Sequence, residues 1–240
     1  KAAQYQVSLV PHEPIKDTGI RRTYPNILSR EGAKGQEFNG FMSTKDNNKP
    51  NHTTILPFTR LLSSPMDYTP GIFNLKEYRY NSPDNRTINT NHHIPSTIAK
   101  ELALYVVIYA PVQMAADLPT NYENHPAFQF ILNVPTDWEN TIVLNGEIGQ
   151  YISTARKDIH SDDWYLGVIT NENGREIKID LSFLDNDKTY HATIYKDPNN
   201  GGWKSNPEEV LIETIVVKKN DVYTASLMPG GGQAIRFSPL

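Results

Sequence analysis

Cysteine is absent from the 240-residue sequence, so it contains neither a disulfide bond nor a thiolate metal site. A strong charge of one sign is also lacking, because the formal net charge is −4 and the longest basic runs are Arg21-Arg22 and Lys218-Lys219. Nucleic-acid binding needs clustered lysine and arginine, so we do not expect it. Long apolar runs are missing too. The uninterrupted apolar run at residues 102–110 is far too short to span a membrane.

The sequence divides into two parts that differ in their pattern of apolar and polar residues. Residues 1–135 mix helical and strand signals with long polar loops, whereas residues 136–240 alternate apolar and polar residues between short turns. This division predicts an α/β part over 1–135 and an all-β part, an antiparallel β-sandwich, over 136–240. Eight strands are expected in the second part: 141–144, 150–155, 164–170, 176–182, 189–195, 211–217, 222–227 and 233–237.

Two helices are expected in the first part. Residues 98–109 are dense in Leu, Val and Ile, and residues 95–97 (PST) offer an N-cap before them. Residues 126–132 form the second expected helix. Residues 74–94 are polar and rich in Asn, which predicts a long surface loop before the first helix.

Two apolar segments of the first part are interpreted as strands. Residues 6–10 predict a buried strand, and residues 53–62 predict a second strand that is interrupted by Pro57. Asp67 and Tyr68 lie in the loop that follows, where an α/β barrel presents residues to its substrate. Because a buried strand comes one helical turn after the first residue, we also expect the sequence to start inside a fold, as a fragment or processed product.

Three glutamates, Glu13, Glu31 and Glu37, make residues 12–41 the most informative segment. Neighbouring carboxylates raise one another's pKa unless a cation compensates their charge. A carboxylate-rich site with no cysteine and one nearby histidine favours calcium over zinc. Two carboxylates also suit glycoside hydrolysis, in which one is the general acid and the other a base or nucleophile. Spacing alone leaves open that Glu31 and Glu37 are surface residues of a solvated helix.

Aromatic and polar residues near the glutamates are suited to contact a sugar. The candidates for substrate binding are His12, Tyr24, Asp67 and Tyr68. Each of the aromatic residues is equally suited to core packing, and this alternative stays open. In the second part, Trp164 and Trp203 are interpreted as packing residues in preference to sugar-stacking ones.

Several stretches of the sequence resemble glycoside hydrolase family 97. The resemblance extends over essentially the whole chain, and it implies that residues 1–135 are the latter part of a (β/α)8 catalytic barrel and residues 136–240 a C-terminal β-sandwich domain. Ser63-Ser64 departs from the pattern, because glycines are expected there. The stretches are HEP at 12–14, TGIRRTYPN at 18–26, REGAKGQEF at 30–38, HTTILPFTRLLSSPMDYTPGIF at 52–73, STIAKELALYVVIYAPVQMAADLPTNYE at 96–123, and WYLGVITN, LSFL and PGGGQAI in the second part.

The resemblance also implies roles for the glutamates. Inverting members of the family, which hydrolyse α-glucosides, carry a Glu after the His of this strand. Retaining members, which include α-galactosidases, lack it and use an Asp from an earlier barrel strand. Glu13 therefore indicates the inverting branch. The resemblance makes Glu13 a general base and calcium ligand, Glu31 a calcium ligand, Glu37 the general acid that also lies at the calcium, and His12 a substrate-binding residue.

The expected function is that of a calcium-dependent glycoside hydrolase that releases glucose from the non-reducing ends of α-glucosides with inversion. The alternatives are an α-galactosidase of the same family and a non-catalytic carbohydrate-binding fragment. Further carboxylates are expected from an N-terminal part of the same protein, without which the chain alone is expected to be inactive. The family also implies a periplasmic or cell-surface location in a Gram-negative bacterium.

Overall fold

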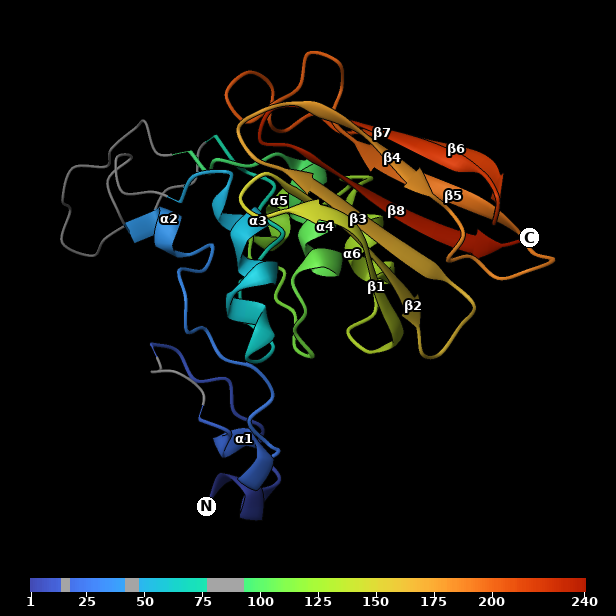
Figure 1. The fold of residues 1–240 in the computed structure, drawn as a ribbon. Helices are drawn as coiled ribbons and strands as arrows, with labels where there is room; N and C mark the ends of the chain where they lie inside the picture. Colours follow the sequence, from blue (N-terminus) through green and yellow to red (C-terminus); the bar gives the residue numbers. More distant parts are fainter. Residues whose placement is uncertain (14–17, 42–47, 77–92) are drawn as a thin grey trace.

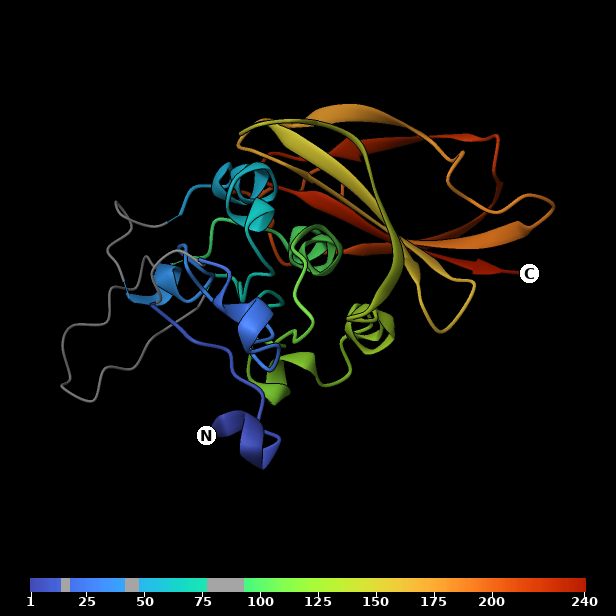
Figure 2. The same ribbon diagram turned by 60° about the horizontal axis from the view of Figure 1, so that its bottom comes forward.

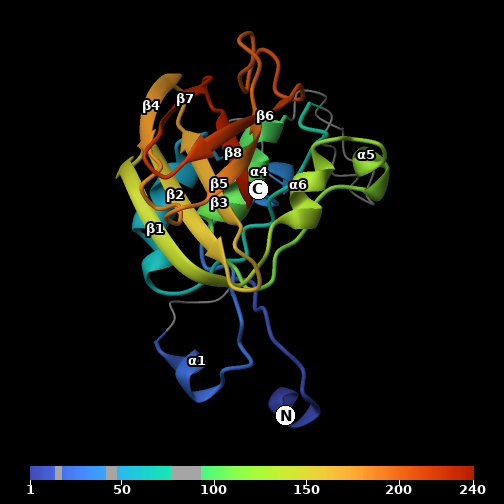
Figure 3. The same cartoon turned by 90° about the vertical axis from the view of Figure 1, so that its right-hand side faces the viewer.

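The computed structural model describes residues 1–13, 18–41, 48–76 and 93–240 (Figure 1). Most of the surface loop expected at residues 74–94 therefore lies outside the described residues. A helix-rich part comes first along the chain, and a domain of eight strands follows it. The two chain ends lie far apart, with the N-terminus in a limb that projects from the rest of the molecule (Figures 1 and 3).

The β-domain has strands at all eight positions that the alternating pattern predicts. Six strands form one antiparallel sheet in the order β1-β2-β3-β8-β5-β6, and β4 pairs with β7 in a second sheet. Apolar side chains of one face of the large sheet, such as Leu166 and Ile235, share a buried cluster with Ile179 of β4 and Leu227 of β7. This arrangement confirms the predicted antiparallel β-sandwich. The strands are β1 (Trp138–Glu147), β2 (Tyr151–Asp158), β3 (Trp164–Thr170), β4 (Arg175–Asp180), β5 (Thr189–Lys196), β6 (Leu211–Lys218), β7 (Val222–Leu227) and β8 (Gly232–Pro239).

Helix α4 (Ile98–Val107) covers the other face of the large sheet, and all of its residues are buried (Figure 2). Thr97 caps the helix as predicted, since its side chain accepts a hydrogen bond from the backbone N–H of Lys100. Gly167 of β3 allows the helix to approach closely. A Cβ atom at this position would lie 2.6 Å from the carbonyl oxygen of Ala103, which is inside van der Waals contact.

One hydrophobic cluster joins the two predicted parts of the chain. It contains Leu102 and Val106 of α4 together with Tyr165, Tyr195 and Ala234 of the large sheet. Each strand of the sheet has alternate residues on opposite faces, so Tyr165 contributes to this cluster and its neighbour Leu166 to the other. The boundary expected between residues 135 and 136 thus separates two segments that share a core.

Residues 53–62 are helical, so their interpretation as a strand is wrong. They form α3 (His52–Ile55), η2 (Leu56–Phe58) and η3 (Arg60–Leu62). The hydroxyls of Thr53 and Thr54 donate to the carbonyls of Pro50 and Asn51, three residues earlier. Pro57 lies in the first turn of η2, where its missing N–H leaves no hydrogen bond unmade.

Two further helices follow α4. Helix α6 (Phe128–Asn133) confirms the helix expected at residues 126–132, whereas α5 (Pro119–Tyr122) was not expected. Helix α5 is a single turn that begins at Pro119, and a helix this short leaves no periodic pattern in the sequence. No helix in the described part of the chain is long and apolar enough to cross a membrane.

The first residues of the chain form the projecting limb, which contains η1 (Ala2–Tyr5) and α1 (Ile20–Thr23). The expectation that residues 6–10 are a buried strand is wrong for this chain, because Val7 and Leu9 are 50% and 40% exposed. The segment extends away from both hydrophobic clusters (Figure 1). It nevertheless pairs in parallel with a neighbour, through an isolated bridge between Leu9 and Ile27.

Candidate active site

Two parallel bridges align three segments that are distant in sequence. The first joins Leu9 to Ile27, and the second joins Arg30 to Met66. Parallel neighbours end at the same edge, and in a barrel this edge carries the active site. The residues just after the bridges, which include His12, Glu31 and Asp67, accordingly lie next to one another. Backbone bonds from Glu31 N to the Pro11 carbonyl (3.1 Å) and from Asp67 N to the Arg30 carbonyl (3.0 Å) continue the alignment.

His12, Glu31 and Glu37 form one group of potential metal ligands within the described residues, with ligand atoms all within 4.8 Å of one another. His12 Nε2 lies 2.7 Å from Oδ2 of the buried Asp67, and its Nδ1 lies 3.6 Å from Glu37 Oε1. The side chains of His12 and Glu37 are about 40% exposed (39% and 41%), so the group opens to solvent on one side. The bond to Asp67, with the negative charges of Asp67, Glu31 and Glu37, raises the pKa of His12.

Glu13 is placed differently from the other two predicted ligands. Its backbone N–H donates to Glu31 Oε2 at 2.9 Å, and its exposed carboxylate is not a member of the group that His12 completes. Its φ of 49° lies in the left-handed region, which a residue with a side chain adopts at a cost of roughly 1–2 kcal/mol. The bond to Glu31 helps to maintain this conformation. The role of Glu13 as a general base stays a prediction.

The predicted substrate-binding residues are not all at the cluster. Tyr68 is buried, and its hydroxyl donates to Gln36 Oε1 at 3.0 Å. Asp67 is buried behind His12 and acts on the cluster through the imidazole. Tyr24 is 53% exposed and directly follows α1. Helix α2 (Phe38–Phe41), which begins next to Glu37, lies at the opposite end of the N-terminal part from α1 (Figure 1).

Arg60 is a contributor that the sequence did not reveal. Its guanidinium donates to the carbonyls of Arg30 (2.9 Å), Glu31 (3.0 Å) and Ser64 (2.9 Å) and so ties the segment of Glu31 to the one before Asp67. Ser64, where a glycine was expected, uses its hydroxyl to accept from Arg30 and Arg60. No local signal identifies Arg60, because the carbonyls of Arg30 and Glu31 are distant in sequence and only the fold brings them to it.

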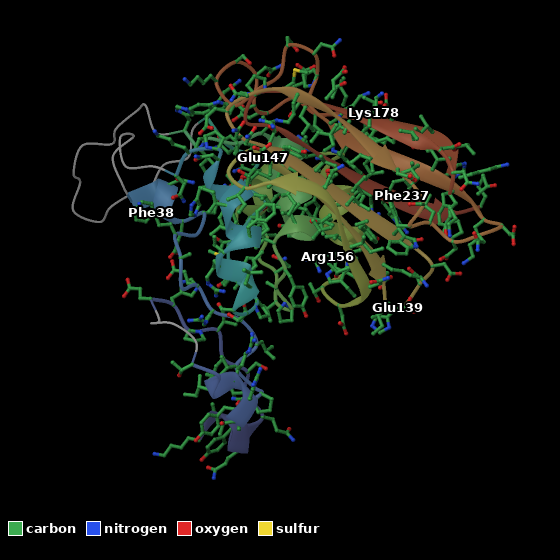
Figure 4. The ribbon with its side chains drawn as sticks, in the orientation of Figure 1. Phe38, Glu139, Glu147, Arg156, Lys178 and Phe237 are labelled. Atoms are coloured by element: carbon green, nitrogen blue, oxygen red, sulfur yellow. The ribbon has the colours of Figure 1, made fainter. Side chains whose placement is uncertain are left out.

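The two tryptophans of the second part that were weighed for sugar stacking are both packed against neighbouring residues. Trp164 is 3% exposed and packs against Phe183 with ring centroids 5.1 Å apart, as the packing interpretation predicted. Trp203 is half-buried, and the space beside its ring is filled by Gly230, where a Cβ atom would lie 2.4 Å from it. Figure 4 shows Phe38, the residue after Glu37, on the side of the molecule away from Glu139 and Phe237.

The donor set of the cluster is suited to a divalent cation. Glu31 and Glu37 supply carboxylate oxygens, the ligands that calcium prefers, from the two ends of one loop. His12 adds an imidazole, whose orientation is fixed by the carboxylate of Asp67 on the opposite nitrogen. Two of the three predicted ligands, Glu31 and Glu37, thus belong to this group.

Comparisons with known proteins agree with the two-part fold. Residues 137–238 match the family described as glycosyl-hydrolase 97 C-terminal, oligomerisation, and residues 1–33 match the family glycoside hydrolase 97. A family 97 enzyme from Pseudoalteromonas sp. strain K8 is similar in structure, with 50% identity and a TM-score of 0.89 in its acarbose complex. The match covers 100% of this chain and 36% of that one. A variant of the same enzyme with panose bound matches at 49% identity, with the same coverage and TM-score.

Two curated relatives are named as α-galactosidases. A retaining alpha-galactosidase of Bacteroides thetaiotaomicron is 37% identical over 98% of this chain and 34% of its own length. A probable retaining alpha-galactosidase of Streptomyces bingchenggensis is 32% identical over 62% of this chain and 20% of its own length. The chain therefore spans about a third of the first relative's length, or less for the second. These names favour the α-galactosidase alternative over the inverting α-glucosidase interpretation.

Paired acidic residues at the aligned ends of parallel segments are an arrangement that glycoside hydrolases use, and the comparisons place the chain in this class of enzyme. The chain belongs to glycoside hydrolase family 97 and corresponds to its C-terminal portion, a short tail of the catalytic domain followed by an antiparallel β-domain.

Proposed function

We propose that this chain carries part of the active site of a calcium-dependent enzyme that hydrolyses α-linked glycosides. The observation that supports the proposal is the convergence of His12, Glu31 and Glu37 within 4.8 Å at the ends of parallel-paired segments. A general acid in this reaction must reach the glycosidic oxygen from a position open to the substrate. Glu37 meets this requirement, because its side chain is 41% exposed while its carboxylate stays near His12.

Each residue of the cluster has a proposed task. Glu37 donates a proton to the leaving oxygen, and His12, held by Asp67, binds a hydroxyl of the sugar. Glu31 and Glu37 are the residues that would hold calcium, and a bound ion would supply positive charge beside their oxygens. Glu13, one residue after His12, is the proposed base that accepts a proton from the attacking water.

The names of the curated relatives favour α-galactosides, but we infer from Glu13 and from the more similar solved enzyme that α-glucosides are the first candidate substrates. Glu13 stands where the resemblance to family 97 puts the base of inverting members. The Pseudoalteromonas enzyme, at about 50% identity, was solved with panose, a sugar built of α-linked glucose, and with acarbose. In an inverting enzyme the acid and base carboxyl groups are roughly 6.5–9.5 Å apart, which leaves room for the attacking water.

Retaining cleavage of α-galactosides is the second candidate. Its support is the printed activity of the two curated relatives, which are 37% and 32% identical to this chain. A retaining mechanism needs a nucleophile close to the acid, roughly 5–5.5 Å away. Glu13 would then have no catalytic task, and a Glu13→Gln variant would retain activity.

A comparison of two substrates distinguishes the candidates. The complete polypeptide that the gene encodes is assayed with p-nitrophenyl α-glucoside and p-nitrophenyl α-galactoside. NMR then identifies the anomer that is first formed when the sugar is released from a natural disaccharide substrate. We expect a higher kcat/KM for the glucoside and an inverted product. A higher kcat/KM for the galactoside with a retained product would establish the second candidate, and cleavage of neither substrate would refute the proposal.

The general acid is tested with Glu37→Gln. We expect a loss of about 10²–10⁴-fold in kcat for maltose, whose leaving group needs protonation, and a much smaller loss for an aryl glycoside with a good leaving group. Glu139→Gln is the matched control, because Glu139 is a partly exposed glutamate of β1 on the far side of the molecule (Figure 4). Unchanged maltose hydrolysis by Glu37→Gln would remove Glu37 from this role.

A further inference from the structure

Gln36 and Tyr68 are joined twice, although they belong to different segments. The backbone N–H of Gln36 donates to the Tyr68 carbonyl at 2.8 Å, and the Tyr68 hydroxyl donates to Gln36 Oε1 at 3.0 Å. Both side chains are buried, with 1% and 3% exposure, so water does not compete for these bonds. Gly35 allows the close approach, because a Cβ atom there would lie 3.3 Å from the Tyr68 carbonyl oxygen.

These two hydrogen bonds between Gln36 and Tyr68 lie directly beside the residues proposed to react. Gln36 precedes the proposed acid Glu37, and Tyr68 follows Asp67, which holds His12. Any movement between Gln36 and Tyr68 would therefore change the distance between Glu37 and His12, now 3.6 Å from Oε1 to Nδ1. Two hydrogen bonds at one point fix both the separation and the orientation of the two segments.

A second set of buried bonds holds Gln36 from the other side. Asn48 donates through its side chain to the Gly35 carbonyl at 3.1 Å, and its backbone N–H donates to Asn39 Oδ1 at 2.9 Å. The backbone N–H of Asn39 donates in turn to the Gln36 carbonyl at 3.0 Å. The turn that carries Glu37 is thus fixed at both of its ends, while the Glu37 side chain itself remains partly exposed.

We propose that Gln36 is a positioning residue that holds the general acid Glu37 at a fixed place relative to His12 and Asp67. The inference rests on the proposed function, since it takes Glu37 as the acid. Gln36 does not touch the substrate in this proposal. It acts through the backbone of the residue that does, and misplacement of a catalytic group by about 1 Å is enough to lower a rate about 10²-fold.

The test uses the complete encoded polypeptide and two substrates that differ in their need for acid. Gln36→Leu keeps much of the side-chain volume and removes the acceptor of the Tyr68 hydroxyl. We expect kcat for maltose to fall about 10²-fold with little change in KM, and kcat for 2,4-dinitrophenyl α-glucoside to fall much less. A purely structural role would lower the two rates by the same factor, and that result would overturn the proposal.

The chain offers a matched control. Gln233 of β8 is also 1% exposed, and its Oε1 accepts a hydrogen bond from the Tyr223 hydroxyl at 2.6 Å. Gln233→Leu removes the same kind of buried bond far from Glu37, and we expect it to leave the ratio of the two rates unchanged. An equal change of this ratio in both variants would also contradict the positioning role.

A second variant keeps the test decisive if Gln36→Leu does not fold. Tyr68→Phe keeps the ring and removes only the hydroxyl that Gln36 accepts from, and we expect a smaller loss that again falls mainly on maltose. Equal losses on both substrates would overturn the proposal. If the unaltered polypeptide cleaves neither the α-glucosides nor the corresponding α-galactosides, the proposed function itself fails. This result differs from that of an active enzyme in which changing Gln36 leaves the ratio of the two rates unchanged.

Discussion

His12 Nε2 lies 2.7 Å from Asp67 Oδ2, although 55 residues separate them along the chain. Asp67 is buried whereas His12 is partly exposed, so the carboxylate fixes the imidazole from the protein side. The other ring nitrogen, Nδ1, consequently faces Glu37. A carboxylate behind a histidine is a common way to set the orientation and basicity of the ring at metal and catalytic sites.

Asp67→Asn tests this relationship. The variant keeps the shape of the side chain but removes its charge, so we expect a loss of about 10–100-fold in kcat/KM of the complete polypeptide and a lower pKa of His12. Steady-state kinetics and histidine NMR titration measure the two effects. Asp163→Asn is the control, because Asp163 is a buried carboxylate of the β-domain that accepts from Arg236 at 2.7 Å. Similar kinetics for both variants would refute the role of Asp67.

Calcium removal tests the proposed ligands. Treatment with a chelator should abolish hydrolysis, and calcium should restore it, because the carboxylates of Glu31 and Glu37 then lose and regain their compensating charge. Glu31→Gln should raise the calcium concentration needed for half-maximal activity. Calcium should also raise the unfolding temperature of the unaltered polypeptide and have a smaller effect on the variant. An unfolding temperature that does not respond to calcium would contradict the site.

Gly167→Ala tests the contact of helix and sheet. A methyl group would lie 2.6 Å from the Ala103 carbonyl oxygen, so α4 must shift, and we expect the free energy of unfolding to fall by about 1–3 kcal/mol. Urea unfolding measures the change. His191→Ala at an exposed position of β5 should stay within about 0.5 kcal/mol of the unaltered protein. Equal stability of the two variants would show that the helix has room to move.

Asp197→Asn tests a buried carboxylate. Burial raises the pKa of Asp197 to about 7, although hydrogen bonds from Thr97 and from the backbone of Gly232, and the charge of the buried Lys100, lower it. Between about pH 4 and 7 the folded state then holds a proton that the unfolded state has released, so this group lowers the free energy of unfolding as pH rises. We expect the variant to match the unaltered protein near pH 4.5 and to be more stable, on the order of a few kcal/mol, at pH 7.5.

Urea unfolding of both proteins at the two pH values isolates the contribution of Asp197. Other titrating groups affect both proteins equally, so only the difference between them is compared. A difference that does not depend on pH would mean that Asp197 is ionised in the folded protein throughout this range.

The β-domain was predictable from the sequence because its signals are local. Several strands alternate apolar and polar residues, and most turns between strands contain Asn or Gly, so all eight strands were expected at their observed places. Residues 53–62 were misinterpreted because the apolar composition of a short segment does not distinguish a strand from a helix.

The candidate site was predictable only in part. Glu31 and Glu37 were expected to meet because the resemblance to family 97 gives both of them to one calcium site, whereas their spacing alone left this open. His12 was expected to contact substrate and not to complete the group of ligands. Arg60 and Gln36 were not foreseen, because their partners are backbone atoms and side chains that the fold brings from other segments.

Gly167 and the apolar face of α4 have a practical consequence for dividing this chain. A recombinant β-domain that starts at residue 136 would leave the large sheet without the helix that fits its glycine, and would expose Tyr165, Tyr195 and Ala234 to water. A piece designed to stay monomeric in solution should therefore begin before Thr97. Shuffling of such domains between related enzymes would need its junction at the same point.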